Sequence, residues 1–355
     1  MAYTTIDDPS AHFNIKLYTG DGNDDRSITN SANAGDFQPD WLWIKQRNTT
    51  RHHMLVDSNR GATKHLSTSL TNGESTNANG VQAFESNGFE LGTDTDVNQD
   101  SGTYVAYQWK ANGGTTSSNS DGSITTTVQA NQTAGFSIVT YTSAAGGQTI
   151  GHGLGAVPEL YIIKERSTNG DDWFVYSKHI GEGKKLRLSG ANAAESDTNI
   201  WQNTAPTSAV ASLQNDGGGV NQNSGGNQTY VGYFFTPIKG FSRFGFYRGN
   251  GGSDGTFVYT GFKPAYVLTR CTSDNTDGWA VFDHKKDVDN PLEFYEFVNN
   301  SSGEGSGTDR VDFLSNGFKW RQSGSSWNGD GRDHIYLAFA ENPYVTSGGV
   351  PTTAR

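Results

Sequence analysis

Two short acidic loops carry the residue types that calcium prefers as ligands. Each loop alternates carboxylate or amide side chains with other residues: Asp21, Asn23 and Asp25 in the first, and Asp94, Asp96 and Asn98 in the second. Calcium favours oxygen-rich loops, but an EF-hand also needs a glycine at its sixth position and a glutamate at its twelfth, and neither loop has them. The alternatives are a solvated turn shaped by side-chain-to-backbone hydrogen bonds and a loose calcium site, the one cofactor that the sequence suggests.

Three tryptophans could contribute to a different kind of site. Trp201, Trp320 and Trp327 lie near Asn, Ser and Gly, outside the repeated strands described below. The flat face of an indole can stack on a sugar ring, so these residues are candidates for glycan binding. Packing in a core or at an interface is the alternative for each of them.

The usual signatures of catalysis are missing from the sequence. There is no G-x-S-x-G motif for a serine nucleophile, and a single cysteine excludes a disulfide framework and a cysteine zinc site. His52, His53 and His65 match no metal-binding spacing. Glycoside hydrolysis needs two carboxylates a few ångström apart, and Glu293 and Glu296 would face opposite sides of a strand. We therefore expect that the protein is not an enzyme.

The elements that must position these residues include a stretch that occurs three times. The copies read FQPDWLWIKQR (Phe37–Arg47), AVPELYIIKER (Ala156–Arg166) and FKPAYVLTRCT (Phe262–Thr272). A proline followed by a short bulky run predicts a buried β-strand, because the ring fixes φ where the ladder needs no N–H. We expect the prolines to lie at equivalent strand starts: Pro39, Pro158 and Pro264.

A basic residue follows each proline by six positions. These bases are Lys45, Lys164 and Arg270. Asp57 and Asp283 stand on the next predicted strand of the first and third copies. Because opposite charges on neighbouring strands stabilise a sheet, we interpret the bases and aspartates as structural cross-strand pairs.

Landmarks on both sides of the copies repeat as well. The glycine turns LYTGDG, TYTSAAGG and FYRGNGG precede them, and YVAYQW, YVGYFF and YLAFA follow, beginning at Tyr104, Tyr230 and Tyr336. Asn-Gly pairs at 87–88 and 316–317, with a degenerate copy at 215–217, predict hairpins. Four landmarks in register over three copies indicate three repeated modules.

The composition favours a β protein. Only 33% of the residues are hydrophobic, 45 are glycine, and no stretch repeats apolar residues with a helical period. We predict an all-β chain of three tandem β-sandwich modules. The expected parts are an N-terminal arm (1–12), module one (13–110), a Gly/Ser/Thr-rich linker (111–134), module two (135–237), module three (238–342) and a C-terminal tail (343–355). The first half of the linker is expected to be flexible, and 123–128 to form an edge strand.

Longer stretches resemble a family of virion-associated proteins from tailed phages, especially marine ones. The resemblance rests on TTIDDPSAHF, PDWLWIKQR, GFSIVTYT, TFVYTGFKPAY and AFAENPYVTSGGVPTTAR, and it spans essentially the whole chain. It implies tandem SPRY-like or concanavalin-like jelly-roll modules and a structural or tail-fibre-like role. It supplies no catalytic residues.

Charge and hydropathy indicate which classes of partner the protein can bind. The formal net charge of −11 argues against nucleic acid, whose binders need a basic stripe. No apolar run approaches the roughly 20 residues that cross a bilayer, and the first residues do not read as a secretory signal. We expect a virion-surface protein, made in the host cytoplasm, that contacts other virion proteins and forms a homo-oligomer on the particle.

The leading hypothesis for the function is a fibre-like component that binds host-surface glycans. A capsid or tail decoration (cement) protein and a glycan-degrading enzyme are the alternatives.

Overall fold

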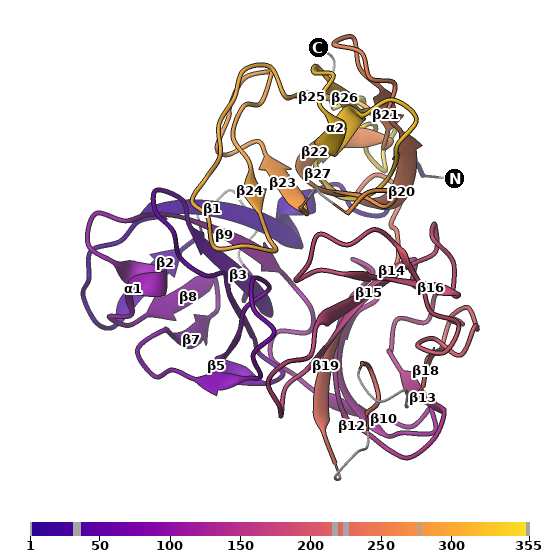
Figure 1. Ribbon diagram of the computed structural model, residues 1–355. Coiled ribbons are helices and arrows are strands. Elements are labelled where there is room, and N and C mark those ends of the chain that lie inside the picture. The colour runs from indigo at the N-terminus through magenta and orange to yellow at the C-terminus, as the bar shows by residue number, and fades with distance from the viewer. Residues whose placement is uncertain (1, 31–36, 215–218, 223–226, 276–277, 353–355) are drawn as a thin grey trace.

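The computed structural model describes residues 2–30, 37–214, 219–222, 227–275 and 278–352. These residues form antiparallel sheets joined by turns, with only three short helical turns among them: η1 (Pro9–Ala11), α1 (Thr95–Asn98) and α2 (Ser325–Asn328). The all-β prediction is confirmed. Figure 1 shows the sheets gathered in three lobes around a common centre.

The same strand arrangement occurs in the three largest sheets. The first sheet has the order β1 (Phe13–Thr19), β9 (Thr103–Trp109), β3 (Trp41–Gln46), β4 (Met54–Asp57), β5 (Gly61–Leu66) and β6 (Ser75–Thr76). The second runs β10 (Ser117–Asn119), β11 (Thr126–Asn131), β12 (Phe136–Thr142), β19 (Thr229–Phe235), β14 (Leu160–Glu165), β15 (Trp173–Ser177), β16 (Lys184–Arg187) and β17 (Glu195–Ser196). The third runs β20 (Ser242–Arg248), β27 (Asp333–Pro343), β22 (Phe262–Cys271), β23 (Ala280–Asp283) and β24 (Glu296–Phe297).

The repeated stretches form the equivalent strands β3, β14 and β22. Each of them pairs in one register with a strand that we call the closing strand of its sheet: β9, β19 or β27. This register places Trp41 opposite Trp109, Leu160 opposite Phe235, and Tyr266 opposite Phe339. The three prolines stand two residues before Trp41, Leu160 and Tyr266, as predicted. Pro264 differs in lying inside its longer strand, at a β-bulge. We call residues 13–110, 111–237 and 238–343 the first, second and third units.

One predicted landmark was two residues out of register. Tyr104 and Tyr230 lie opposite Tyr18 and Tyr141, and the residue in the same place of the third sheet is His334, opposite Tyr247. The three ring pairs also stack alike, with centroids 5.0, 5.0 and 4.8 Å apart. The third closing signature therefore begins at His334 and not at Tyr336. Sequence matching missed it because a histidine replaces the tyrosine.

A small sheet covers the outer face of each large one. These sheets comprise β2 (Arg26–Thr29), β8 (Gly88–Leu91) and β7 (Val81–Glu85); β13 (Gln148–Gly151) and β18 (Val210–Leu213); and β21 (Phe257–Tyr259), β26 (Gly317–Trp320) and β25 (Val311–Leu314). A separate apolar cluster fills each sandwich. Both Asn-Gly pairs connect hairpins, β7–β8 and β25–β26, as predicted. The third predicted turn, 215–217, lies outside the described residues.

The inner faces of the large sheets share one central core. Trp41 and Trp43 of β3, Leu160 of β14, and Tyr266 and Leu268 of β22 belong to the same buried cluster. Apolar residues on both faces of the repeated strands therefore have two causes. One face fills its own sandwich, and the other packs against the other two units in an approximately threefold arrangement (Figure 1).

The predicted linker is part of the second sheet. Residues 117–119 and 126–131 form β10 and β11, which extend that sheet beyond β12. Ala111 and Ala134 at its two ends are buried in the central core. The Asp40 carboxylate accepts hydrogen bonds of 2.7, 2.8 and 2.7 Å from the N–H groups of Ala111, Gly113 and Gly114. The prediction of a flexible first half is therefore wrong, because β10 pairs with β11 through backbone hydrogen bonds. The strand expected at 123–128 is β11, which lies between β10 and β12 and not at the edge of the sheet.

The N-terminal arm packs against the third unit of its own chain. Thr4 and Ile6 are buried, and the Tyr3 hydroxyl donates a 2.5 Å hydrogen bond to the carbonyl of Gly261. The Asp7 carboxylate accepts a hydrogen bond of 2.6 Å from the N–H of Ser347. The arm and the beginning of the tail are therefore joined to each other.

Candidate functional site

The three repeated bases are buried at the seams between units, not in cross-strand pairs. Each one donates a hydrogen bond to a backbone carbonyl of the neighbouring unit: Lys45 to Ser301 at 3.4 Å, Lys164 to Thr71 at 3.4 Å, and Arg270 to Asn192 at 2.7 Å. Burial lowers the pKa of Lys45 and that of Lys164 to about 8. These residues hold the units together, so their repetition has a structural cause.

Asp57 and Asp283 have other partners than the sequence suggested. Asp57 forms a buried ion pair with Arg60 and accepts a 2.7 Å hydrogen bond from the Tyr233 hydroxyl of the second unit. Asp283 forms a buried pair with Lys286, at 3.1 Å. The predicted pairing with the repeated bases is therefore wrong. The true partners, three residues further along the chain, return from the turn after each strand.

The three candidate tryptophans are not surface platforms. Trp201 and Trp320 are 0% exposed and Trp327 is 4% exposed. Trp201 belongs to the sandwich core of the second unit, and Trp320 and Trp327 to that of the third, where their rings stack at 6.2 Å. The expectation that they stack on sugar is corrected, because a chain with few aliphatic residues uses its indoles to fill the sandwiches.

The acidic loops come together, but as a hydrogen-bonded turn. The Asn98 side chain accepts a 3.1 Å hydrogen bond from the N–H of Asp21 and donates one of 2.8 Å to the carbonyl of Asn23. Asp21 pairs with Arg26 at 3.2 Å, and Asp94 caps α1 by accepting from the N–H of Asp96. Asp25 is exposed in the same loop and has a positive φ of 53°.

The same turn occurs in the other units, which favours a structural role for the acidic loops. Asn221 and Asn328 are buried like Asn98 and bind the equivalent glycine turns through both side-chain atoms. Within the described ranges, no group of three or more His, Cys, Asp or Glu side chains could hold a metal ion. Calcium binding stays an expectation without geometric support.

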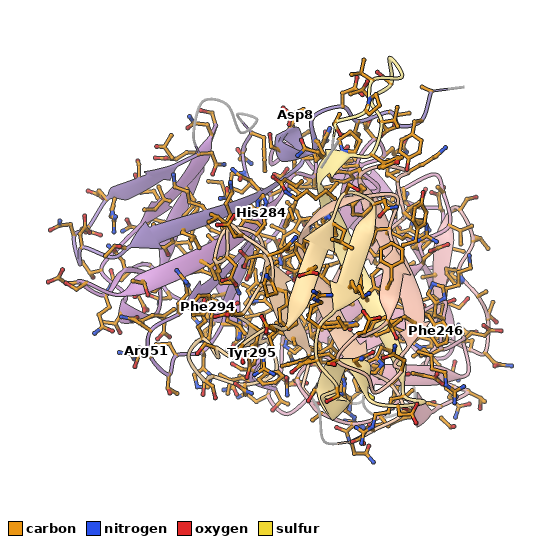
Figure 2. The ribbon with its side chains drawn as sticks, turned by 90° about the horizontal axis from the view of Figure 1, so that it is seen from above. Asp8, Arg51, Phe246, His284, Phe294 and Tyr295 are labelled. Carbon is orange, nitrogen blue, oxygen red and sulfur yellow. The ribbon has the colours of Figure 1, made fainter. Side chains whose placement is uncertain are left out.

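A groove beside β20 has the features of a binding site that the buried tryptophans lack. It has a volume of about 700 Å³ and lies where the third unit meets the second unit and the N-terminal arm. Phe246, Phe257 and Tyr259 line it and expose 50%, 45% and 48% of their surface. Figure 2 shows Phe246 at the periphery, across the molecule from Arg51. Three exposed aromatic side chains beside one groove form a surface on which flat apolar ligand faces can stack.

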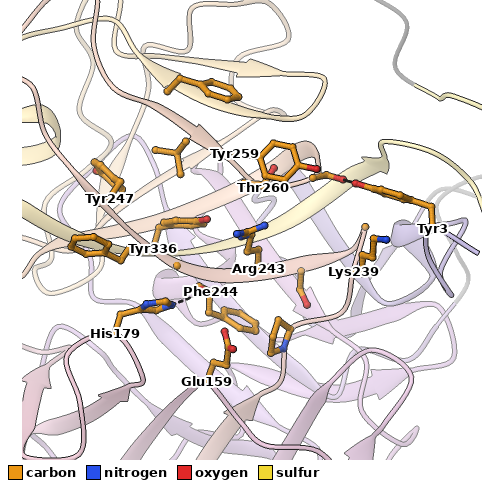
Figure 3. Close-up of a pocket in the computed structure, with 18 residues that line it drawn as sticks. Tyr3, Glu159, His179, Lys239, Arg243, Phe244, Tyr247, Tyr259, Thr260 and Tyr336 are labelled. Carbon is orange, nitrogen blue, oxygen red and sulfur yellow. Dashed lines mark hydrogen bonds between the residues drawn. The ribbon is translucent and has the colours of Figure 1, made fainter. Parts of the chain in front are cut away.

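Two basic side chains stack on the tyrosines of this groove (Figure 3). The Arg243 guanidinium carbon lies 5.6 Å from the ring centroid of Tyr259, and Lys239 Nζ lies 4.5 Å from that of Tyr3. Both bases are exposed. Cation–π contacts restrict these long side chains, so the two charges stand at defined places along the groove.

The polar groups below the rings come from the second unit. A ring nitrogen of His179 lies 3.1 Å from the carbonyl of Phe244, and Glu159 pairs with Lys178 at 2.8 Å. Glu159 is the one carboxylate among the described residues that line the groove. Glycoside hydrolysis with two carboxylates therefore has no pair here.

Two tyrosine hydroxyls of the groove keep their protons at neutral pH. Burial raises the pKa of Tyr3 well above its usual value, and hydrogen bonding to Tyr259 raises it further. Burial likewise raises the pKa of Tyr336 to about 12. A Cβ on Gly245, which pairs with Tyr336 across the strands, would lie 2.5 Å from the Tyr336 ring. Glycine at 245 therefore lets that ring lie across β20.

The groove lies beside an edge of β20 that no described strand covers. In the second sheet, β11 pairs with β12 along the equivalent edge, from Asn131 opposite Phe136 to Thr127 opposite Thr140. The third sheet has the order β20-β27-β22-β23-β24 and ends at β20. At its two ends, β20 bonds to the closing strand through the carbonyl of Phe241 and the N–H of Gly249. Backbone groups alternate along an antiparallel strand, so those of residues 244 and 246 point to the open edge.

Sequence reasoning missed this site, although a signal was present. Phe246 stands directly before the repeated tyrosine, where the first unit has Leu17 and the second has Thr140. Phe257 and Tyr259 alternate in a short strand, which places both side chains on one face. A large aromatic residue in one copy at a position where the other copies differ indicates a role specific to that copy.

Comparison with known protein families gives one match. Residues 8–343 match the model of a domain of unknown function, DUF7483. The chain belongs to this family. No curated protein and no solved structure matches, so the SPRY-like or concanavalin-like form of the DUF7483 sandwiches stays a prediction. Among the described helices of this DUF7483 chain, none is long and apolar enough to cross a membrane.

Proposed function

We propose that this DUF7483 protein is a non-catalytic, fibre-like component of a phage particle that binds a host-surface saccharide in the β20 groove. The observation that carries the proposal is the exposure of Phe246, Phe257 and Tyr259 beside one groove. Apolar ring faces with adjacent hydrogen-bonding groups suit the two kinds of surface on a sugar ring. The phage setting rests on the resemblance of the sequence to virion-associated proteins.

The saccharide site is expected to be weak in a single molecule. A groove that holds a few sugar–aromatic contacts, each contributing about 1 kcal/mol, gives affinities near the millimolar range. A particle displays many copies, and linking weak sites can raise the overall affinity by about 10² to 10⁴ without a new contact. A homo-oligomer on the virion surface would provide this.

The test uses fluorescent beads that carry the full chain at high density. It measures how strongly these beads bind to host cells and to a saccharide array. The unmodified chain should bind, and Phe246→Ala or Tyr259→Ala should reduce binding at least about tenfold. Phe294→Ala is the control, because Phe294 lies outside the groove, away from Phe246 in Figure 2. Thermal unfolding of each variant should stay within about 2 °C of the parent.

A decoration or cement role is the second candidate. The observation that favours it is the uncovered edge of β20, because an unpaired strand edge is a template for a strand of another protein. Beads that ignore host cells, together with particles that become fragile when they lack the protein, would replace the saccharide proposal with this one.

A further inference from the structure

The charges in the β20 groove restrict the class of its ligand. Lys239 and Arg243 are the Lys and Arg side chains among the described residues that line the groove, and neither forms an ion pair within the described part of the chain. The carboxylate of Glu159 forms an ion pair with Lys178, 2.8 Å away, so the groove has two cations and one paired carboxylate. The groove therefore carries an excess of positive charge, although the whole chain has a net charge of −11.

Hydrogen-bond donors also dominate the open edge. The N–H groups of residues 244 and 246 point away from β27, and the carbonyl of Phe244 already has the His179 ring as a partner, at 3.1 Å. The hydroxyl of Tyr3 donates to Gly261 and cannot serve as a free donor at the same time. Two ammonium or guanidinium groups and two backbone N–H groups thus face a site with one paired carboxylate. This arrangement favours a ligand that supplies acceptors with negative charge.

The positions of the bases relative to the rings suit a sugar acid. Arg243 stacks on Tyr259, which is 48% exposed, so a cation lies directly beside an exposed ring. A pyranose that stacks on Tyr259 or Phe246 would bring an equatorial carboxylate or sulfate within reach of the Arg243 guanidinium. Lys239, held over Tyr3 at the arm, lies at the other end of the lining segment 239–246 and can serve a second charged sugar.

From this geometry we infer that the groove selects anionic saccharides, chains whose sugar rings carry carboxylate or sulfate groups, over neutral ones. The inference rests on the proposed function, since it names the ligand class of the same groove. The aromatic residues supply contact area that charged and neutral sugars share. Arg243 and Lys239 supply the discrimination.

The test uses full-length protein and pairs of saccharides that differ in charge. Immobilised tri-galacturonate and its methyl ester share one carbohydrate skeleton, and sialyllactose with lactose is a second pair. At low salt the charged member should bind about fivefold to twentyfold more tightly, because each exposed ion pair contributes about two- to fivefold. At about 0.5 M salt the difference should nearly vanish, because screening weakens exposed charges.

Variants assign the effect to the two bases. Arg243→Gln and Lys239→Gln should each lower binding of the charged member about two- to fivefold and leave the neutral member unchanged. Phe246→Ala should weaken both members alike. Arg248→Gln is the control, since Arg248 is an exposed base of the same strand that does not line the groove.

The outcomes separate the two proposals. Equal binding of charged and neutral members overturns the ligand class and leaves the saccharide function standing. Binding of neither member of either pair by the bead-bound chain overturns both. A peptide that copies residues 124–133, which include β11, serves as a probe for strand addition. If it binds the chain and Phe246→Pro abolishes this binding while Phe246→Ala does not, the groove accepts a strand and the saccharide inference fails.

Discussion

Trp173 Nε1 donates a hydrogen bond of 2.9 Å to the carbonyl of Ser67, across the seam between the second and first units. Two equivalent contacts close the ring of units: Trp279 Nε1 to the carbonyl of Arg187 at 2.8 Å, and a ring nitrogen of His53 with the carbonyl of Phe297 at 3.1 Å. The three donors, His53, Trp173 and Trp279, occupy equivalent positions in their units. Each lies two residues before a core residue: Leu55, Val175 or Val281. Repetition therefore records how the units contact one another as well as how each one folds.

Removing one of these contacts should weaken the whole molecule. Trp173→Phe keeps most of the buried ring but leaves the carbonyl of Ser67 without its partner, which costs about 1–3 kcal/mol. Urea denaturation should show this loss, and amide hydrogen exchange should increase at residues 66–68. Trp201→Phe is the control, because Trp201 Nε1 bonds within its own unit, to Lys184. Similar exchange at residues 66–68 in both variants would contradict a role at the seam.

The seam lysines predict an unusual dependence of stability on pH. Burial lowers the pKa of Lys45 and of Lys164 to about 8, so between pH 8 and 9.5 the unfolded chain binds protons that the folded chain has released. The free energy of unfolding should therefore rise with pH in this window, by on the order of 1–2 kcal/mol per lysine. Lys45→Met should remove the part of this rise in unfolding free energy that Lys45 contributes. Lys285→Met, at an exposed lysine, should leave the rise unchanged. A flat or falling profile of the unmodified chain over this window would show that the lysines do not titrate there.

A buried charge cluster joins the first and third units. Lys286 pairs with Asp283 and Glu296, and the Tyr107 hydroxyl donates to both carboxylates, at 2.9 and 3.0 Å. Burial raises the pKa of Glu296, and the two carboxylates hold the pKa of Lys286 above its usual value. Lys286→Met should cost about 3–5 kcal/mol, because it leaves two buried acids without a counter-charge. Urea denaturation at pH 7 measures this loss.

The chain supplies its own apolar control for that cluster. At the seam between the second and third units, the positions equivalent to those of the cluster hold other residues. Leu337 corresponds to Tyr107, Ser177 to Asp283, Ile180 to Lys286 and Leu186 to Glu296. The quadruple change Tyr107→Leu, Asp283→Ser, Lys286→Ile and Glu296→Leu copies this set. It should recover most of the stability that Lys286→Met loses, since a well-packed apolar set often equals a buried ion pair. Stability below that of Lys286→Met would show that the cluster cannot be exchanged for its counterpart.

Calcium should leave the protein unchanged if the acidic loops are structural turns. Asp21 and Asn98 already bind backbone groups and Arg26, so an ion would have to replace these hydrogen bonds. Melting temperatures with 5 mM calcium and with EDTA should agree within about 1 °C. A rise of several degrees with calcium, lost in Asp21→Asn, would restore the calcium alternative.

The sequence allowed the strands to be predicted better than their packing. The repeated prolines and bulky runs identified β3, β14 and β22 and their common register, because strand formation depends on local residues. The shared core could not be read, since an apolar second face looks the same whether a sheet or another unit covers it. The polar segment 111–134 looked like a linker because it has few apolar residues, whereas β10 and β11 join the sheet through backbone bonds. Trp201, Trp320 and Trp327 looked exposed because their neighbours are polar, whereas their own side chains are buried.

The last prediction concerns the division into three independent modules. Every large sheet directs one face into the central core, which includes Leu160 and Ile162 of the second unit. There Tyr233 of the second unit stacks on Trp41 of the first, and Phe235 contacts Phe339 of the third. An isolated second unit, residues 111–237, would expose this face to water, and an exposed patch of that kind drives association or unfolding. We expect this fragment to aggregate or to lack dispersed amide signals in NMR spectra, while the full chain melts in a single transition. Co-expression with fragments 1–110 and 238–355 should restore a soluble complex, because the seams supply the missing contacts. If fragment 111–237 is monomeric and folded, this sandwich is stable alone. The shared core would then orient the units without being needed for their folding.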